Sequence, residues 1–149
     1  MYIYTNITYR MQDLEKQLRD RGFRVTAFRV SLLAIFHKTN SSLTTEEVLG
    51  LLNPRRNKVT VYRALEAFEK QGLIHSVPDK KKLARYALCR ESCLSHEYHN
   101  DNHAHLICDI CSRTFCLDEV PVPSIPTQLG FKVSESSLVL KGECLGCAE

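Results

Sequence analysis

Two short cysteine motifs constrain this chain more than any other feature. Cys108 and Cys111 form one CxxC pair, Cys144 and Cys147 form a second, and 32 residues separate the two pairs. A CxxC turn directs two sulfurs at one point, so two such turns complete the tetrahedral four-thiolate shell that suits zinc at ~2.3 Å. The sequence therefore predicts a structural zinc site at these four cysteines, with a thiol–disulfide pair or unligated cysteines as the alternatives.

Charge divides the chain into two parts of different character. Residues 1–88 carry 16 Lys and Arg against 8 Asp and Glu, whereas residues 89–149 carry 4 against 9 and hold all seven cysteines. A basic segment suits a polyanionic partner, and a cysteine-rich acidic segment suits metal. We therefore predict a nucleic-acid-binding domain over residues 1–88, a hinge loop with metal ligands over 89–102 and a metal-binding domain over 103–149.

Composition also excludes several classes of protein. No run approaches the ~20 consecutive apolar residues of a membrane span, and residues 1–18 lack the basic-then-apolar layout of a secretory signal. We expect a cytoplasmic protein, in which cysteines bind metal or act in redox chemistry more often than they form stable disulfides. The sequence offers no nucleophile–base arrangement, phosphate-binding loop or paired catalytic carboxylates, so neither enzymatic activity nor a small-molecule substrate is expected.

The basic segment has the pattern of a winged helix-turn-helix. Apolar residues at helical spacing and capping residues predict three helices, which begin at Thr26, at Thr44 and after Asn57. A period of two then predicts a hairpin of residues 73–77 and 84–88 with lysines at its tip. In such a module the third helix enters the major groove of DNA, and the wing reaches backbone phosphates.

The predicted DNA contacts lie at the start of the third helix and at the tip of the hairpin. They are Asn57, Lys58, Thr60, Lys80, Lys81 and Lys82. A lysine run is also typical of a solvated turn, and a polar helix face is typical of an ordinary surface. The prediction therefore depends on the combination of helices, hairpin and net charge.

A second group of metal-binding residue types gathers around the boundary between the two parts. His103 and His105 alternate along a predicted strand, so both side chains point to one face. His75 lies on the first hairpin strand, and Cys89 ends the second. A metal held by these four would tie the hairpin to the cysteine-rich segment, and three imidazoles with one thiolate suit zinc better than iron or manganese. Further possible ligands are Cys93, His96, His99 and Cys116.

Six segments in order, NKVTVYRAL, GLIHSV, RYALC, HAHLICDIC, GFKV and LKGECLGC, resemble the ferric uptake regulator family of bacterial metal-dependent repressors. The resemblance covers about residues 14–147. It implies an α+β chain with an N-terminal winged helix, a small C-terminal α/β dimerisation domain and a four-cysteine zinc site. It also implies homodimers that bind palindromic, AT-rich operator DNA when the sensing metal is loaded, with DNA contacts from Tyr62 and Arg63.

Within that family, the ligand set is similar to the sensing site of zinc uptake regulators. Iron-type members have a histidine in the loop that here reads KTNSSLTTE, and a glutamate where Cys89 stands. We therefore expect a zinc-responsive repressor, with structural and regulatory Zn²⁺. The alternatives are regulation by Fe²⁺, by Mn²⁺ or by oxidation of Cys89, Cys93 or Cys116, and a zinc-stapled adaptor that binds protein instead of DNA.

Overall fold

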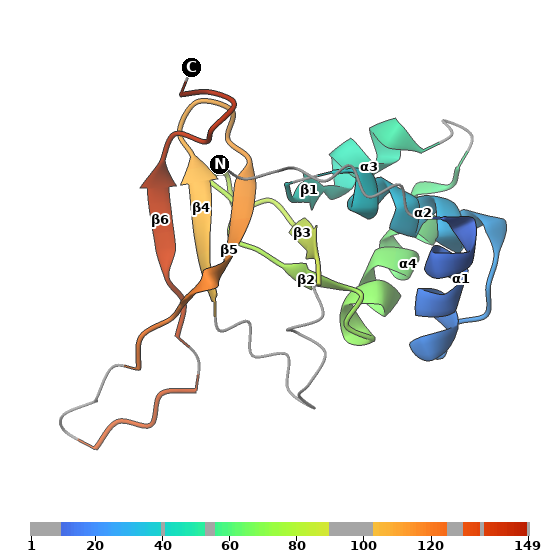
Figure 1. Ribbon diagram of the computed structural model, residues 1–149, viewed down its shortest axis with the longest axis horizontal. Coiled ribbons are helices and arrows are strands. Elements are labelled where there is room, and N and C mark those ends of the chain that lie inside the picture. The colour runs from blue at the N-terminus through green and yellow to red at the C-terminus, as the bar shows by residue number, and fades with distance from the viewer. Residues whose placement is uncertain are drawn as a thin grey trace.

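The computed structural model describes residues 10–39, 41–52, 56–89, 103–124, 130–134 and 136–148. In these residues, helices α1–α4 and a first sheet lie on one side of the molecule, and a second sheet lies on the other (Figure 1). This arrangement confirms the predicted α+β fold with an N-terminal winged helix. None of the described helices combines the length and the apolar composition that crossing a bilayer demands.

The predicted helices begin at their predicted caps. They are α2 (Ala27–Lys38), α3 (Thr45–Leu51) and α4 (Lys58–Lys70). Thr44 and Glu47 form the capping box of α3, with Thr44 N donating to Glu47 Oε2 over 2.7 Å. Asn57 caps α4, because its Oδ1 accepts a hydrogen bond from Val59 N at 2.8 Å. Capping groups close to the helix in sequence therefore fix where each helix starts.

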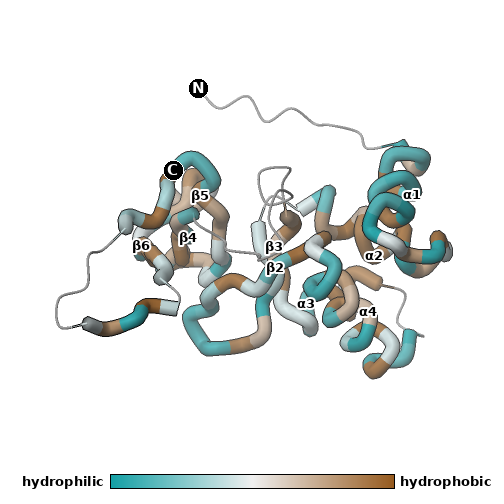
Figure 2. Tube along the Cα trace, turned by 90° about the horizontal axis from the view of Figure 1, so that it is seen from below, coloured by the Kyte–Doolittle hydropathy of each residue, from teal (hydrophilic) through white to brown (hydrophobic). Residues whose placement is uncertain are grey.

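A fourth helix, α1 (Met11–Asp20), was not predicted from the sequence. It buries only Leu14 and Leu18 and is mostly hydrophilic, whereas α2 is mostly hydrophobic (Figure 2). Two apolar residues four positions apart are a weak signal for a helix. The position of α1 therefore depends on its contact with α2.

One apolar core holds the four helices together. Its fully buried side chains each contribute roughly 1.5–3 kcal/mol of hydrophobic free energy. They include Leu18, Leu32, Leu33, Phe36, Val48, Val61, Leu65 and Phe68. The apolar faces predicted for α2 and α4 supply most of this core, so the polar face of α4 is left exposed.

The first sheet contains the predicted hairpin and one further strand. Strands β2 (Ile74–Ser76) and β3 (Arg85–Leu88) pair antiparallel, and β1 (Leu43–Thr44) pairs with the other edge of β3. The short strand β1 was not predicted. It places the segment before α3 next to the hairpin.

The second sheet, which we call the C-terminal sheet, has the strand order β5-β4-β6. It consists of β4 (His103–Cys108), β5 (Thr114–Pro121) and β6 (Val139–Gly142). Strands β4 and β5 are antiparallel, whereas β4 and β6 are parallel. All regular structure among the described residues after 102 is strand, and this sheet carries the predicted metal ligands.

A histidine links the first two helices. His37 Nε2 lies 2.9 Å from Gln17 Oε1, and burial lowers the pKa of His37 to about 4. In the unfolded chain the same imidazole titrates near its ordinary value of 6.5. The unfolded chain therefore takes up this proton first as the pH falls, and the stability associated with His37 is lost between pH 6.5 and 4.

We expect acidification from pH 7 to 5 to destabilise the wild-type chain relative to His37→Gln. The difference should be about 1 kcal/mol, after allowing for the partial exposure of His37. Urea unfolding of both proteins at the two pH values measures it, because all other titrating groups are shared. A difference in unfolding free energy that stays constant with pH would contradict the assignment.

Candidate metal centres

The two CxxC pairs meet because of the parallel pairing of β4 and β6. Parallel strands end at the same edge of a sheet, and Cys108, the last residue of β4, lies opposite Gly142, the last residue of β6. Cys144 follows two residues later. The sulfur atoms of all four CxxC cysteines lie within 4.8 Å of one another.

The geometry of this four-cysteine centre fits zinc. Metal–sulfur distances of ~2.3 Å in a tetrahedron give sulfur–sulfur distances of about 3.8 Å. The Sγ atoms of Cys111 and Cys144 are 3.8 Å apart, far from the length of a disulfide bond. These sulfurs are therefore spaced to be ligands of one ion.

Backbone groups prepare Cys108 to be a thiolate. The N–H groups of Cys111 and Cys144 point to Cys108 Sγ, with N–S distances of 3.5 and 3.4 Å. These hydrogen bonds lower the pKa of Cys108 to about 6. By contrast, a hydrogen bond with Cys144 raises the pKa of Cys147 to about 12. A divalent cation stabilises the thiolate form of each sulfur that it binds, so the donor set suits Zn²⁺.

A second group, which we call the histidine–cysteine cluster, joins the two sheets. It consists of His75 from β2, His103 and His105 from β4, and Cys116 from β5. One ligand atom of each residue lies within 4.8 Å of the others. His105 and Cys116 are direct cross-strand partners, so their side chains share one face of the C-terminal sheet.

The imidazoles of this cluster are buried and suited to bind a cation. His103 Nε2 and both ring nitrogens of His105 have no hydrogen-bond partner within the described part of the chain. Burial, and to a smaller extent the proximity of His103, lowers the pKa of His105 to about 4, so this ring is neutral near pH 7. Neutral imidazoles with free lone pairs are metal ligands, and buried polar atoms without partners are otherwise unfavourable.

His75 lies between two cysteines. Its Nε2 is 3.4 Å from Cys116 Sγ, and its Nδ1 is 3.4 Å from Cys89 Sγ. The two ring nitrogens point in diverging directions, so one ion bound to Nε2 cannot also lie on the Cys89 side of the ring. The structure thus groups Cys116 with the three histidines and places Cys89 behind His75. The sequence instead predicts Cys89 as the fourth ligand of the sensing site and Cys116 as a possible additional ligand.

One further side chain, a carboxylate, approaches the cluster. Asp118 on β5, which was not predicted, has Oδ1 3.9 Å from His103 Nε2. Cys93, His96 and His99 lie outside the described residues.

The predicted DNA contacts of α4 lie mostly on its exposed face. Thr60, Tyr62 and Arg63 are exposed there. Lys58 forms an ion pair with Glu46 at 2.7 Å, and its Nζ lies 5.8 Å from the centre of the Tyr62 ring. Tyr62 is thereby held close to the start of α4.

The hairpin lysines differ from one another. Lys81 and Lys82 are exposed in the turn between β2 and β3. Lys80 also contacts the turn that follows β4, where its Nζ lies 3.5 Å from Oδ1 of Asp109, inside the first CxxC motif. The turn of the hairpin therefore lies against the sheet that carries both metal centres.

A sequence model described as the ferric uptake regulator family matches residues 20–140, well over half of the chain. The chain belongs to the ferric uptake regulator family. As a member, it is a metal-responsive transcriptional regulator and not an enzyme.

Individual relatives match this chain over most of its length. The ferric uptake regulation protein of Synechococcus elongatus is 27% identical over 95% of this chain and 97% of its own. The zinc uptake regulation protein of Escherichia coli is also 27% identical, over 91% of this chain and 79% of its own. A solved structure of a zinc uptake regulator complexed with zinc and DNA has a TM-score of 0.64 at 24% identity, covering 93% of this chain and 92% of that one. The chain is equally identical to a regulator named for iron and to one named for zinc. Sequence identity therefore does not determine the sensed metal, which has to be inferred from the ligands.

We expect Cys116→Ser to abolish thiolate coordination in the histidine–cysteine cluster, and Cys89→Ser to retain it, because only Cys116 lies on the Nε2 side of His75. Cobalt added to protein that keeps zinc at the four-cysteine centre reports this through sulfur-to-cobalt charge-transfer absorbance. The two variants are matched controls for each other. Loss of this absorbance in Cys89→Ser alone would show that Cys89 is the ligand.

Proposed function

We propose that this protein is a zinc-responsive transcriptional repressor that binds palindromic operator DNA as a homodimer in the cytoplasm. Zinc at the four-cysteine centre is structural, and zinc at the histidine–cysteine cluster is the signal. The observation that carries the proposal is the cluster itself, which takes ligands from both sheets. An ion there changes how firmly the two parts of the chain are joined.

The donor set supports zinc as the regulatory ion. Three imidazoles and one thiolate match the preferences of a borderline-soft ion, whereas iron and manganese sites contain carboxylates more often. The nearest described carboxylate to this set, Asp118, approaches His103 at 3.9 Å and lies outside the group of four. Ferrous iron and manganese remain the competing ions, and Asp118 is the residue that would favour them.

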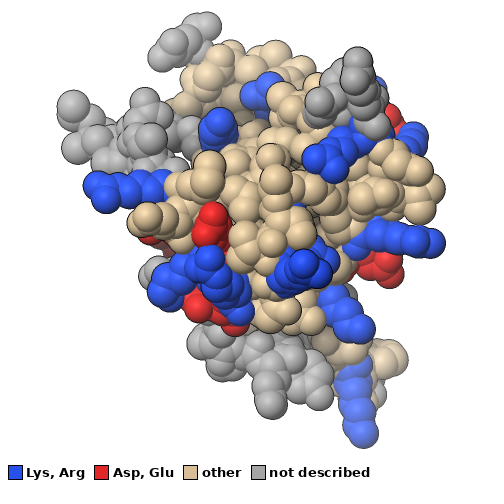
Figure 3. Space-filling model, turned by 90° about the vertical axis from the view of Figure 1, so that its right-hand side faces the viewer, with Lys and Arg blue, Asp and Glu red and all other residues tan. Residues whose placement is uncertain are grey.

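The exposed face of α4 supports DNA binding. Tyr62 is 43% exposed, and Arg63 lies beside it. Lys and Arg side chains are spread over the side of the molecule that the helices form (Figure 3). In a helix-turn-helix protein, side chains at the start of the recognition helix contact bases, and surrounding positive charge contacts phosphates.

The position of His75 supports a coupling between metal and DNA. Helix α4 ends at Lys70 and β2 begins at Ile74, so a ligand on β2 lies a few residues from the DNA-contacting helix. An ion that joins His75 to β4 and β5 favours one placement of α4 relative to the C-terminal sheet. Typical coupling free energies of ~1–3 kcal/mol change DNA affinity about 5- to 150-fold, which is enough to switch a promoter.

Exposed apolar side chains support a dimer through the C-terminal sheet. Strand β6 is an edge strand, and its Val139 and Leu140 are 37% and 39% exposed. Val133, shortly before β6, is 59% exposed. Symmetric dimers place two recognition helices about 34 Å apart, which matches successive major grooves and a palindromic site.

We expect the wild-type protein to bind its DNA only when zinc is added beyond the four-cysteine centre. The DNA is a duplex selected from a random pool by the zinc-loaded protein, and zinc, ferrous iron and manganese are titrated separately. Arg63→Ala should weaken binding by roughly 10- to 100-fold. Lys132→Ala, which removes one positive charge from the acidic part, should have little effect.

Three outcomes would contradict parts of this proposal. Activation by iron or manganese alone would contradict zinc as the signal. A duplex that binds equally well with and without any metal would contradict regulation. Failure to select any duplex, together with binding that does not weaken with salt, would indicate an adaptor for protein.

We expect Leu140→Glu to shift the protein from dimer to monomer, because a charge replaces an apolar side chain on the proposed interface. Sedimentation analysis measures the change, and Lys141→Glu, the neighbouring position on β6, is the control for added negative charge. A dimer that survives Leu140→Glu unchanged would place the interface elsewhere.

A further inference from the structure

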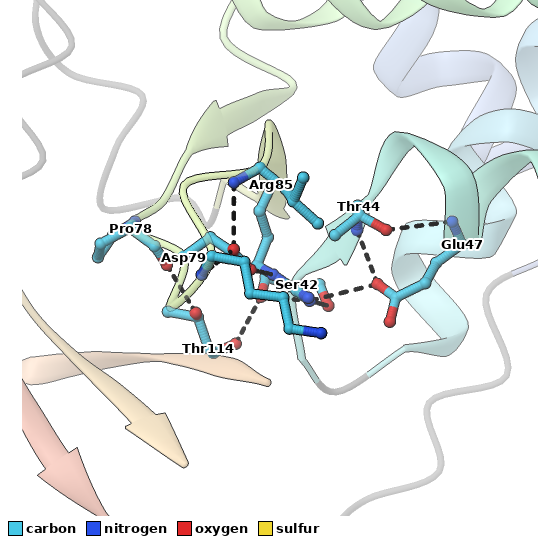
Figure 4. Close-up of polar contacts among 9 residues, drawn as sticks. Ser42, Thr44, Glu47, Pro78, Asp79, Arg85 and Thr114 are labelled. Carbon is cyan, nitrogen blue, oxygen red and sulfur yellow. Dashed lines mark hydrogen bonds and ion pairs between the residues drawn. The ribbon is translucent and has the colours of Figure 1, made fainter. Parts of the chain in front are cut away.

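Thr114, the first residue of β5, forms a second connection between the two parts of the chain. Its side chain is completely buried, and its Oγ1 donates a hydrogen bond to the carbonyl of Pro78 over 2.7 Å. Its own carbonyl accepts hydrogen bonds from Ser42 N at 2.9 Å and from Ser42 Oγ at 2.8 Å. We call Thr114, Ser42 and Pro78 the clasp (Figure 4).

A buried ion pair holds the partners of Thr114 in place. Arg85 on β3 donates from Nη1 to the carbonyl of Ser42 at 3.1 Å and from Nε to Oδ1 of Asp79 at 2.7 Å. The side chains of Arg85 and Asp79 are 6% and 4% exposed. Arg85 also pairs with Glu47, the capping residue of α3, at 3.2 Å. The clasp is therefore continuous with the start of a helix of the DNA-binding part (Figure 4).

The clasp lies close to the histidine–cysteine cluster on the same two segments. Thr114 and Cys116 are two residues apart on β5, so both side chains face the N-terminal part. Cys116 approaches His75, and Thr114 binds Pro78, three residues further along the hairpin. Strand β5 thus contacts the hairpin at two successive points. One point fixes a position, whereas two points fix an orientation.

The clasp also adjoins the four-cysteine centre. The N–H of Cys108 donates to the carbonyl of Arg113 at 2.9 Å, which closes the turn that carries the first CxxC pair. Thr114 follows this turn directly. A zinc ion in the four-cysteine centre therefore steadies the position from which Thr114 reaches Pro78.

We infer that Thr114 is a positioning residue for metal sensing, a role that rests on the function proposed above. Its hydrogen bond to Pro78 holds the hairpin so that His75 faces His103, His105 and Cys116 before the ion arrives. The ion then has less ordering to impose, and binds at a lower concentration. Without the clasp, zinc must also bring the hairpin to the C-terminal sheet, and saturating zinc still achieves this.

The test is the free zinc concentration at which DNA binding is half complete. Thr114→Val removes the hydroxyl at nearly constant shape, and we expect it to raise this concentration about tenfold, the effect of leaving one buried carbonyl unpaired. DNA affinity at saturating zinc should stay within about twofold of wild type. Thr114→Ser keeps the hydroxyl and should restore the wild-type response.

Thr39→Val is the matched control. Thr39 Oγ1 also donates to a backbone carbonyl, that of Ile35 at 2.9 Å, but at the C-terminal end of α2 and away from the cluster. We expect this variant to respond to zinc as the wild type does. Ser42→Ala removes another side-chain hydrogen bond of the clasp and should shift the response in the same direction as Thr114→Val. If Thr114→Val does not fold, the zinc response of Ser42→Ala tests the inference instead.

Specific results would overturn the inference. These are an unchanged zinc midpoint in Thr114→Val, an equal shift in Thr39→Val, or an equal loss of DNA affinity at every zinc concentration. If the wild type itself shows no zinc response, the proposed function fails instead. In that case, competition with a zinc chelator measures the zinc affinity of the cluster directly. An unchanged zinc affinity in Thr114→Val overturns the inference about the clasp.

Discussion

The joint between the two parts of this protein depends on a buried group of imidazoles and a thiol that both parts supply. Burying polar atoms without hydrogen-bond partners is unfavourable by roughly 1–3 kcal/mol each. Several nitrogens of His103 and His105 are in this situation among the described residues. A cation bound by these nitrogens would offset this penalty and strengthen the joint. The clasp at Thr114 supplies a contribution that needs no ion in the histidine–cysteine cluster.

The features predicted correctly from the sequence are those encoded by neighbouring residues. A CxxC turn, a capping box such as that of Thr44 and Glu47, and an alternating His-x-His strand each depend on a few consecutive positions. Helix α1 and strand β1 were missed for the opposite reason. Helix α1 has two buried leucines, and β1 has two residues and exists through its pairing with β3, about 40 residues later.

The ligand set illustrates the same limit within the candidate site. His75, His103 and His105 could be grouped from strand patterns alone. The relation of Cys89 and Cys116 to His75 could not, because it depends on which ring nitrogen each sulfur meets. The cross-strand pairing of His105 with Cys116 places Cys116 beside the histidines, and predicting it requires the register of β4 and β5. The contact between Ser42 and Thr114, which are 72 residues apart, cannot be predicted from any local pattern.

The parallel pairing of β4 with β6 has a consequence for biosynthesis. At ~5–20 residues per second, the ribosome needs roughly 2–6 s to add the 32 residues between the two cysteine pairs. During this interval the nascent chain has made only two of the four cysteines of the four-cysteine centre, and the central strand β4 lacks one neighbour. Completion of the sheet and assembly of the four-cysteine centre therefore both wait for β6, and until then β4 keeps an open strand edge of the kind that promotes aggregation.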